Sequence, residues 1–161
     1  MANTQSMCTS FLGELMTATH NFGTAPIRAA STADTFKAAL YLTTATVDAS
    51  TTAYTATGEV TSANYTAGGV TVTNANPPTS TNSSSTAGVG YWTPSASIVY
   101  GSSGSPVTFS SFNAVLIYNS TQSNKAVSVH TFTAQTVTSG TFTLTMPSNT
   151  TSTALLRLAT T

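Results

Sequence analysis

The stretch from residue 112 to residue 146 constrains the fold of this chain most strongly. It contains three apolar runs that are separated by polar turns. In the last run Phe142, Leu144 and Met146 alternate with threonines, the period-two pattern of a strand with one buried and one solvent-facing side. We therefore predict three consecutive antiparallel strands, a meander, over residues 112–118, 125–133 and 141–146.

The first of these runs has a different pattern from the last. Residues 114–118 read Ala-Val-Leu-Ile-Tyr and are apolar at every position. A short run rich in β-branched and aromatic residues is typical of a strand that is covered on both faces. The cover is expected to come from a second sheet or from another subunit.

Further strands are predicted on both sides of this stretch. Clear alternation covers residues 34–43, and residues 95–100 are predicted to form another strand. The pair Gly68-Gly69 leads as a turn or bulge into a strand at residues 70–73. A closing strand is expected at residues 152–158, with Ala154, Leu156 and Leu158 on one face. Seven or eight short strands separated by Ser-, Gly- and Pro-rich turns predict an all-β fold, an antiparallel β-sandwich or jelly roll, as one domain over residues 1–161.

Two segments depart from the strand pattern. Residues 6–20 place apolar side chains at spacings of three and four, which predicts a short amphipathic helix within an N-terminal helix or arm over residues 1–23. It would cover one end of the core or pack on a neighbouring subunit. Residues 76–90 contain Pro77-Pro78 and a Ser/Thr-rich run, and they are expected to form a flexible exposed loop.

Charged residues are scarce, and this narrows the classes of partner. They make up 5% of the 161 residues and balance to no net charge, whereas an ordinary soluble domain has roughly 25%. Without a basic patch, nucleic acid is not an expected partner. The chain shows no membrane-spanning run and no signal peptide, so we expect cytoplasmic synthesis and no membrane partner. A neutral surface favours association, and we expect a homo-oligomer.

The sequence offers no recognisable catalytic or metal-binding motif. His20 and His130 are the only histidines, and His130 is interpreted as a hydrogen-bonded structural residue within a strand. Cys8 is interpreted as a small buried hydrophobic residue. Neither zinc-ligand spacing nor a calcium or phosphate loop occurs, so no metal and no cofactor are expected and the chain is predicted to be non-enzymatic. An enzyme would need His130 in a cleft with a carboxylate such as Asp48 or Glu59.

The order of several motifs resembles a group of small structural proteins encoded by tailed bacteriophages. The resemblance extends over about residues 1–158 and includes four elements in order: Thr-Phe-Lys-Ala-Ala-Leu-Tyr-Leu at 35–42, Thr-Gly-Glu-Val at 57–60 with Asn-Tyr-Thr-Ala-Gly-Gly-Val at 64–70, Trp92 with the strand after it, and Phe-Asn-Ala-Val-Leu-Ile-Tyr at 112–118. It implies a virion component present in many copies and made in the host bacterial cytoplasm.

Within this group we favour a capsid decoration or cement protein that stabilises the shell. The chain is compact and lacks the long repetitive shaft of a fibre, although a tail, head-fibre or head-to-tail subunit is an alternative. The expected partners are the major capsid protein or other virion proteins, together with further copies of the chain, for which a trimer is favoured. Contact with the shell is expected at residues 6–22 or 77–90, and the candidate interface residues are Met7, Phe11, Leu15, Tyr91 and Trp92.

A carbohydrate-binding adhesion module is the alternative from a different class. Tyr91, Trp92 and Tyr100 would then form an exposed platform on which sugar rings stack. The competing interpretation of Trp92 is an anchor for the neighbouring sheet, and a buried Trp92 would count against the adhesion module.

Overall fold

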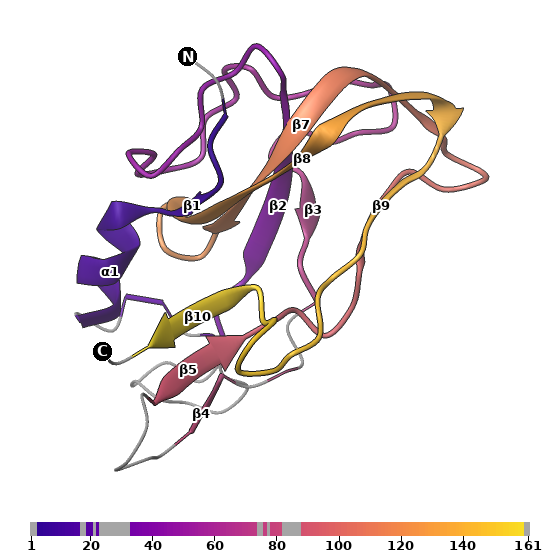
Figure 1. The fold of residues 1–161 in the computed structure, drawn as a ribbon. Helices are drawn as coiled ribbons and strands as arrows, with labels where there is room; N and C mark the ends of the chain where they lie inside the picture. Colours follow the sequence, from indigo (N-terminus) through magenta and orange to yellow (C-terminus); the bar gives the residue numbers. More distant parts are fainter. Residues whose placement is uncertain are drawn as a thin grey trace.

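The computed structural model describes residues 3–16, 19–20, 22, 33–73, 76, 78–81 and 88–159. Their strands form antiparallel sheets of five, three and two strands, stacked in a sandwich-like arrangement (Figure 1). The prediction of an all-β antiparallel fold is confirmed. In this part of the chain no helix is long and apolar enough to cross a membrane.

The five-stranded sheet is the centre of the molecule. Its strand order is β1 (Ser6–Met7), β8 (Lys125–Gly140), β7 (Val107–Asn119), β2 (Phe36–Leu42) and β3 (Val70–Thr71). The three-stranded sheet has the order β10 (Leu156–Ala159), β5 (Val89–Trp92) and β4 (Thr79–Ser80), and the two-stranded sheet pairs β6 (Ile98–Tyr100) with β9 (Phe142–Leu144).

The apolar run in β7 is buried on both faces, as its pattern predicts. Ala114, Val115, Leu116 and Ile117 have no exposed surface, and Tyr118 has 2%. The Tyr118 ring stacks on Tyr54, with 4.9 Å between the ring centroids. Strand β2 lies beside β7 and is buried in the same way, so the described part of the chain itself supplies cover for these strands.

The third strand of the predicted meander has a different partner. Strand β8 continues to Gly140 along β7, and β9 pairs with β6 through Ile98–Leu144 and Tyr100–Phe142. The predicted alternation within this run is confirmed, because Phe142, Leu144 and Met146 are half-buried while the threonines between them are exposed. A period-two pattern predicts which residues share a face of the strand, but it does not predict which strand pairs with it.

The N-terminal segment also differs from its prediction. Ser6 and Met7 lie in strand β1, because they pair with Val129 and Ser128 of β8, and the helix α1 covers only Thr9–Met16. Residues 1–2, 17–18, 21 and 23 of the predicted arm lie outside the described residues.

Two further predictions need correction. Within the flexible loop expected at residues 76–90, residues 79 and 80 form β4, and residues 89 and 90 belong to β5, with which β4 pairs. Residues 77 and 82–87 of that loop lie outside the described residues. The closing strand spans Leu156–Ala159, and Leu158 is 44% exposed although its pattern predicts burial. The residue opposite Leu158 is Gly90, which has no side chain to cover it.

Candidate functional site

An apolar groove of about 280 Å³ lies between the N-terminal segment and the three-stranded sheet. Both walls lie at the left of Figure 1, with α1 above β10 and β5. The lining residues are Met7, Phe11, Leu15, Phe22, Pro78, Thr79, Ser80, Gly90, Tyr91, Trp92, Leu156 and Leu158. None of these residues is charged, so the groove suits an uncharged, apolar occupant.

One face of the three-stranded sheet forms the lower wall. Leu156 pairs with Trp92, and Gly90 pairs with both Leu158 and Ser80. Directly paired residues point to the same face of a sheet, so these five residues share the wall. The missing side chain at Gly90 leaves space there, since a Cβ atom built on it would meet only the Leu158 carbonyl oxygen, at 3.9 Å.

Aromatic rings close the floor of the groove. Phe22 stacks on Phe36 with 4.4 Å between the ring centroids, and it lies 4.7 Å from the Trp92 ring and 5.9 Å from the Phe11 ring. Phe11 is 2% exposed and Phe22 is 7% exposed. The floor therefore ties the N-terminal segment to β2 and β5 through ring contacts.

Trp92 is an anchor of this floor and does not form a sugar-stacking platform. It is 3% exposed, its Nε1 donates to the Asn76 carbonyl oxygen at 3.1 Å, and Tyr100 is fully buried. Of the three predicted platform residues only Tyr91 is partly exposed. The burial of Trp92 therefore counts against the adhesion module.

The five candidate interface residues are brought together by the fold. Met7 comes from β1, Phe11 and Leu15 come from α1, and Tyr91 and Trp92 come from β5, yet all five line the groove. Phe11 and Trp92 lie at its floor, while Tyr91 is half-buried. The two segments expected to contact the shell thus border a single cavity.

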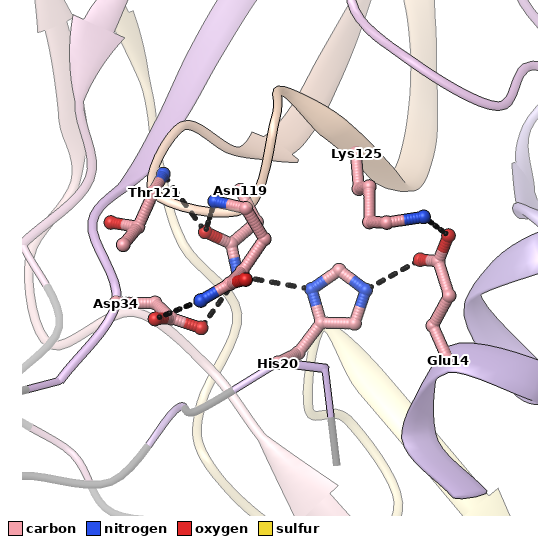
Figure 2. A network of polar contacts seen from close by, with 7 residues as sticks. Glu14, His20, Asp34, Asn119, Thr121 and Lys125 are labelled. Carbon is pink, nitrogen blue, oxygen red and sulfur yellow. Dashed lines mark hydrogen bonds and ion pairs between the residues drawn. The ribbon is translucent and has the colours of Figure 1, made fainter. Parts of the chain in front are cut away.

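A buried polar network adjoins the groove floor. Figure 2 shows His20 between Glu14 and Asn119, with Nε2 at 2.7 Å from Glu14 Oε2 and Nδ1 at 3.1 Å from Asn119 Nδ2. Glu14 also pairs with Lys125 Nζ at 2.6 Å, and Asn119 Nδ2 donates to Asp34 Oδ2 at 2.8 Å. Gln122 donates to the other Asp34 oxygen at 3.1 Å. These contacts connect α1 to β7, to β8 and to Asp34, which lies two residues before β2.

The pKa values in the network have identifiable causes. Burial lowers the pKa of His20 below its ordinary value of 6.5, against the opposing effect of Glu14. Burial alone would raise the pKa of Glu14, but the hydrogen bonds from Lys125 and His20 outweigh it and leave that pKa below its ordinary value. His20 is therefore neutral and Glu14 is ionised at neutral pH.

The other two candidate reactive side chains are those of His130 and Cys8. His130 is partly buried, its Nε2 lies 2.9 Å from Ser128 Oγ, and burial lowers its pKa to about 4. The hydrogen bond predicted for this histidine is present. Cys8 has no exposed surface, as predicted for a buried hydrophobic residue. Among the described residues no group of three or more His, Cys, Asp and Glu could hold a metal ion.

Glu59 belongs to a second, closed polar cluster. Its Oε1 accepts from Tyr65 OH at 2.5 Å and from the Gly68 backbone N–H at 2.8 Å, and its Oε2 accepts from Tyr54 OH at 2.7 Å. Glu59 is only 6% exposed. Its oxygens are already engaged, and the cluster explains why Gly-Glu-Val and Tyr-x-x-Gly-Gly occur together in the sequence.

Comparison with known proteins finds no protein-family model, no curated protein and no solved structure that matches the chain. The chemistry of the groove and of the polar network is therefore the basis for a functional proposal.

The His20 network was not predicted from the sequence. Its members come from four separate segments, and no local motif joins them. The available signal was the scarcity of charge, because Glu14 and Asp34 are two of only four acids in the chain. In such a chain each buried charge needs a specific partner, so convergence of the acids on a histidine was a reasonable expectation.

Proposed function

We propose that this chain is a non-enzymatic structural protein of a tailed-bacteriophage virion, a capsid decoration or cement protein, and that the groove contacts a second copy of the chain. The uncharged groove is the observation that supports the proposal. It unites the two segments expected to form contacts, and its chemistry is that of a protein–protein interface core, where charged residues are depleted and aromatic residues and Met are enriched.

The rim of the groove favours association. Leu158 and Val99 are the large hydrophobic residues that the described part of the chain exposes, and Leu158 lies on the rim. In the described residues β10 is an edge strand of its sheet and hydrogen-bonds to β5 alone. Open edges next to an apolar surface are sites where another chain adds by backbone pairing.

A second copy fits this surface better than a charged partner. The chain has no net charge, so two copies approach without repulsion. Pairing at β10 would cover Leu158 and satisfy the open backbone groups at the same time. The phage assignment itself comes from the resemblance of the motifs at residues 35–42, 57–70 and 112–118, and a tail, neck or fibre subunit is the alternative within that class.

Light scattering of the purified full chain over a concentration series tests the proposal. We expect a stable oligomer, with a trimer favoured for a protein seated at a threefold position of the shell. Gly90→Leu places a side chain in the groove without backbone strain and should weaken association by about tenfold, equivalent to about 1.4 kcal/mol.

Gly104→Leu is the matched control, because Gly104 is exposed in a turn with no atom near its missing Cβ. It should leave association unchanged. A monomer that joins added empty capsids, and loses this binding in Gly90→Leu, would assign the groove to the shell protein. A monomer that ignores capsids but binds glycans would contradict the decoration role.

A further inference from the structure

We propose that Glu14, His20 and Asn119 form an acid-sensitive latch, which holds helix α1 and thus the upper wall of the groove on the sheet. The three side chains join α1 to the end of β7, and the imidazole of His20 has no exposed surface. The effect on groove-mediated assembly rests on the proposed function, whereas the latch itself can be tested on a single chain.

The orientation of the Asn119 amide is fixed by the backbone. Its Oδ1 accepts hydrogen bonds from the backbone N–H groups of Thr121 at 3.1 Å and Gln122 at 3.2 Å. A nitrogen in that position could not accept either bond. The NH₂ group must therefore face the other way, toward Asp34 and His20.

This orientation determines where the proton of His20 lies. The Asn119 NH₂ can only donate, so His20 Nδ1 at 3.1 Å must accept. The imidazole is then neutral with its hydrogen on Nε2, which donates to Glu14 Oε2 at 2.7 Å. The ring can complete both contacts only in this tautomer.

Protonation of His20 therefore breaks the latch. A second proton on Nδ1 would point at the Asn119 NH₂, and rotating the amide would sacrifice its bonds to Thr121, Gln122 and Asp34. Water cannot compensate at a ring with no exposed surface. The described charged groups near the ring are Glu14 of α1, Asp34 before β2 and Lys125 of β8, and burial outweighs the attraction of the two carboxylates.

The latch is coupled to the groove through ring contacts. The His20 ring lies 4.8 Å from the Phe11 ring and 6.2 Å from the Phe22 ring, and both phenylalanines line the groove. Movement of His20 would disturb the contact between Phe22 and Trp92. Trp92 is the single tryptophan of the chain, so its fluorescence reports on this site alone.

The sign of the pH effect follows from the lowered pKa of His20. Its contribution to stability is complete above its ordinary pKa of 6.5 and decreases as the pH falls from there toward the lower pKa of the folded state. The pKa of Glu14 lies below its ordinary value of 4.5, so Glu14 is ionised where this decrease begins. The pKa of His130 is lowered from 6.5 to about 4, so its contribution to the stability of the fold also decreases between these pH values. A His130 variant is therefore needed as a control.

The first experiment needs no variant. Nitrogen-15 NMR of the imidazole groups in the full chain at about pH 7 should show His20 neutral, with its hydrogen on Nε2. A positively charged His20, or one with the hydrogen on Nδ1, would overturn the proposal.

The second experiment is a titration of Trp92 fluorescence from about pH 8 to about pH 5, with light scattering of the same samples. The emission should shift to longer wavelength below the ordinary pKa of histidine. His20→Gln should abolish this transition, and His130→Gln should retain it.

A transition that persists in His20→Gln, or vanishes only in His130→Gln, would refute the latch. Oligomer loss without a fluorescence change would also refute it, whereas a fluorescence transition in a chain that never assembles would count against the proposed function alone.

Discussion

At the scale of single residues, the buried carboxylate of Glu59 shows how a chain with few charges uses one of them. Glu59 holds two tyrosine hydroxyls and the Gly68 N–H, and thereby shapes the turn that leads into β3. Burial and then the Glu59 carboxylate raise the pKa values of Tyr54 and Tyr65 above their ordinary value. Glu59 thus organises this turn.

Glu59→Gln should lower the free energy of unfolding by about 2 kcal/mol, because it replaces a charged hydrogen-bond acceptor by a neutral amide. Urea unfolding at one fixed protein concentration measures the change. Asp48→Asn is the matched control, since among the described residues its carboxylate accepts hydrogen bonds only from Ser50 nearby. Equal losses in the two variants would show that Glu59 has no special role.

Gly69 is the second residue whose identity the turn requires. Its φ is +75°, and a Cβ atom there would lie 1.8 Å from the Ala38 carbonyl oxygen of β2. Gly69→Ala should therefore cost about 3 kcal/mol or more of unfolding free energy, from backbone strain and displacement of β2. Gly104→Ala in an open turn should be neutral in the same unfolding assay, and comparable losses would contradict the explanation.

At the scale of elements, the docking of the N-terminal segment depends on a few contacts. Strand β1 has two residues and α1 has eight, too short for either to be stable alone. They are held by the backbone bond from Cys8 to Val127, by the packing of Phe11 and by the Glu14 ion pair with Lys125. Removing one of these contacts should therefore increase the fraction of molecules in which the N-terminal segment is undocked from the sheet.

Cys8 can report this release, because it is the only cysteine and is fully buried. Burial, with smaller contributions from Asp48 and Glu14, raises the pKa of its thiol to about 12. Reaction with a thiol reagent near pH 8 should be slow, and Glu14→Gln should accelerate it by about tenfold, the equivalent of about 1.4 kcal/mol.

Arg157→Met removes a charged side chain of β10 that does not line the groove and whose Nε donates to the Thr151 carbonyl oxygen. It should leave the Cys8 reaction rate unchanged. Equal acceleration in both variants would mean that thiol exposure reports global unfolding and carries no information on the N-terminal segment.

Strand positions could be predicted from the sequence because alternation is a local property. The burial of Ala114 to Tyr118 and the alternation at Phe142 and Leu144 are both present in the structure. Partners could not be predicted, since β9 pairs with β6 and β1 pairs with β8 across long stretches of chain. Met7 looks like part of a helix by its spacing, but the edge of β8 offers it backbone hydrogen bonds instead.

At the scale of the whole molecule, the all-β class followed from the number and spacing of the strands. The candidate interface residues came from two distant segments, and the fold places all of them in one groove. The groove itself could not be predicted, because its volume depends on Gly90 lying opposite Leu158. The polar network could not be predicted either, since it depends on the contacts of Asn119 with residues far earlier in the chain.

The pairing of β1 with β8 has a consequence for synthesis of the chain. Ser6 pairs with Val129, so the partners are separated by about 120 residues, and a ribosome makes the first long before the second. Met7, Phe11 and Leu15 must therefore wait, without their binding surface, until most of the chain has emerged. General chaperones that bind apolar segments would have access to these side chains until β8 has been made.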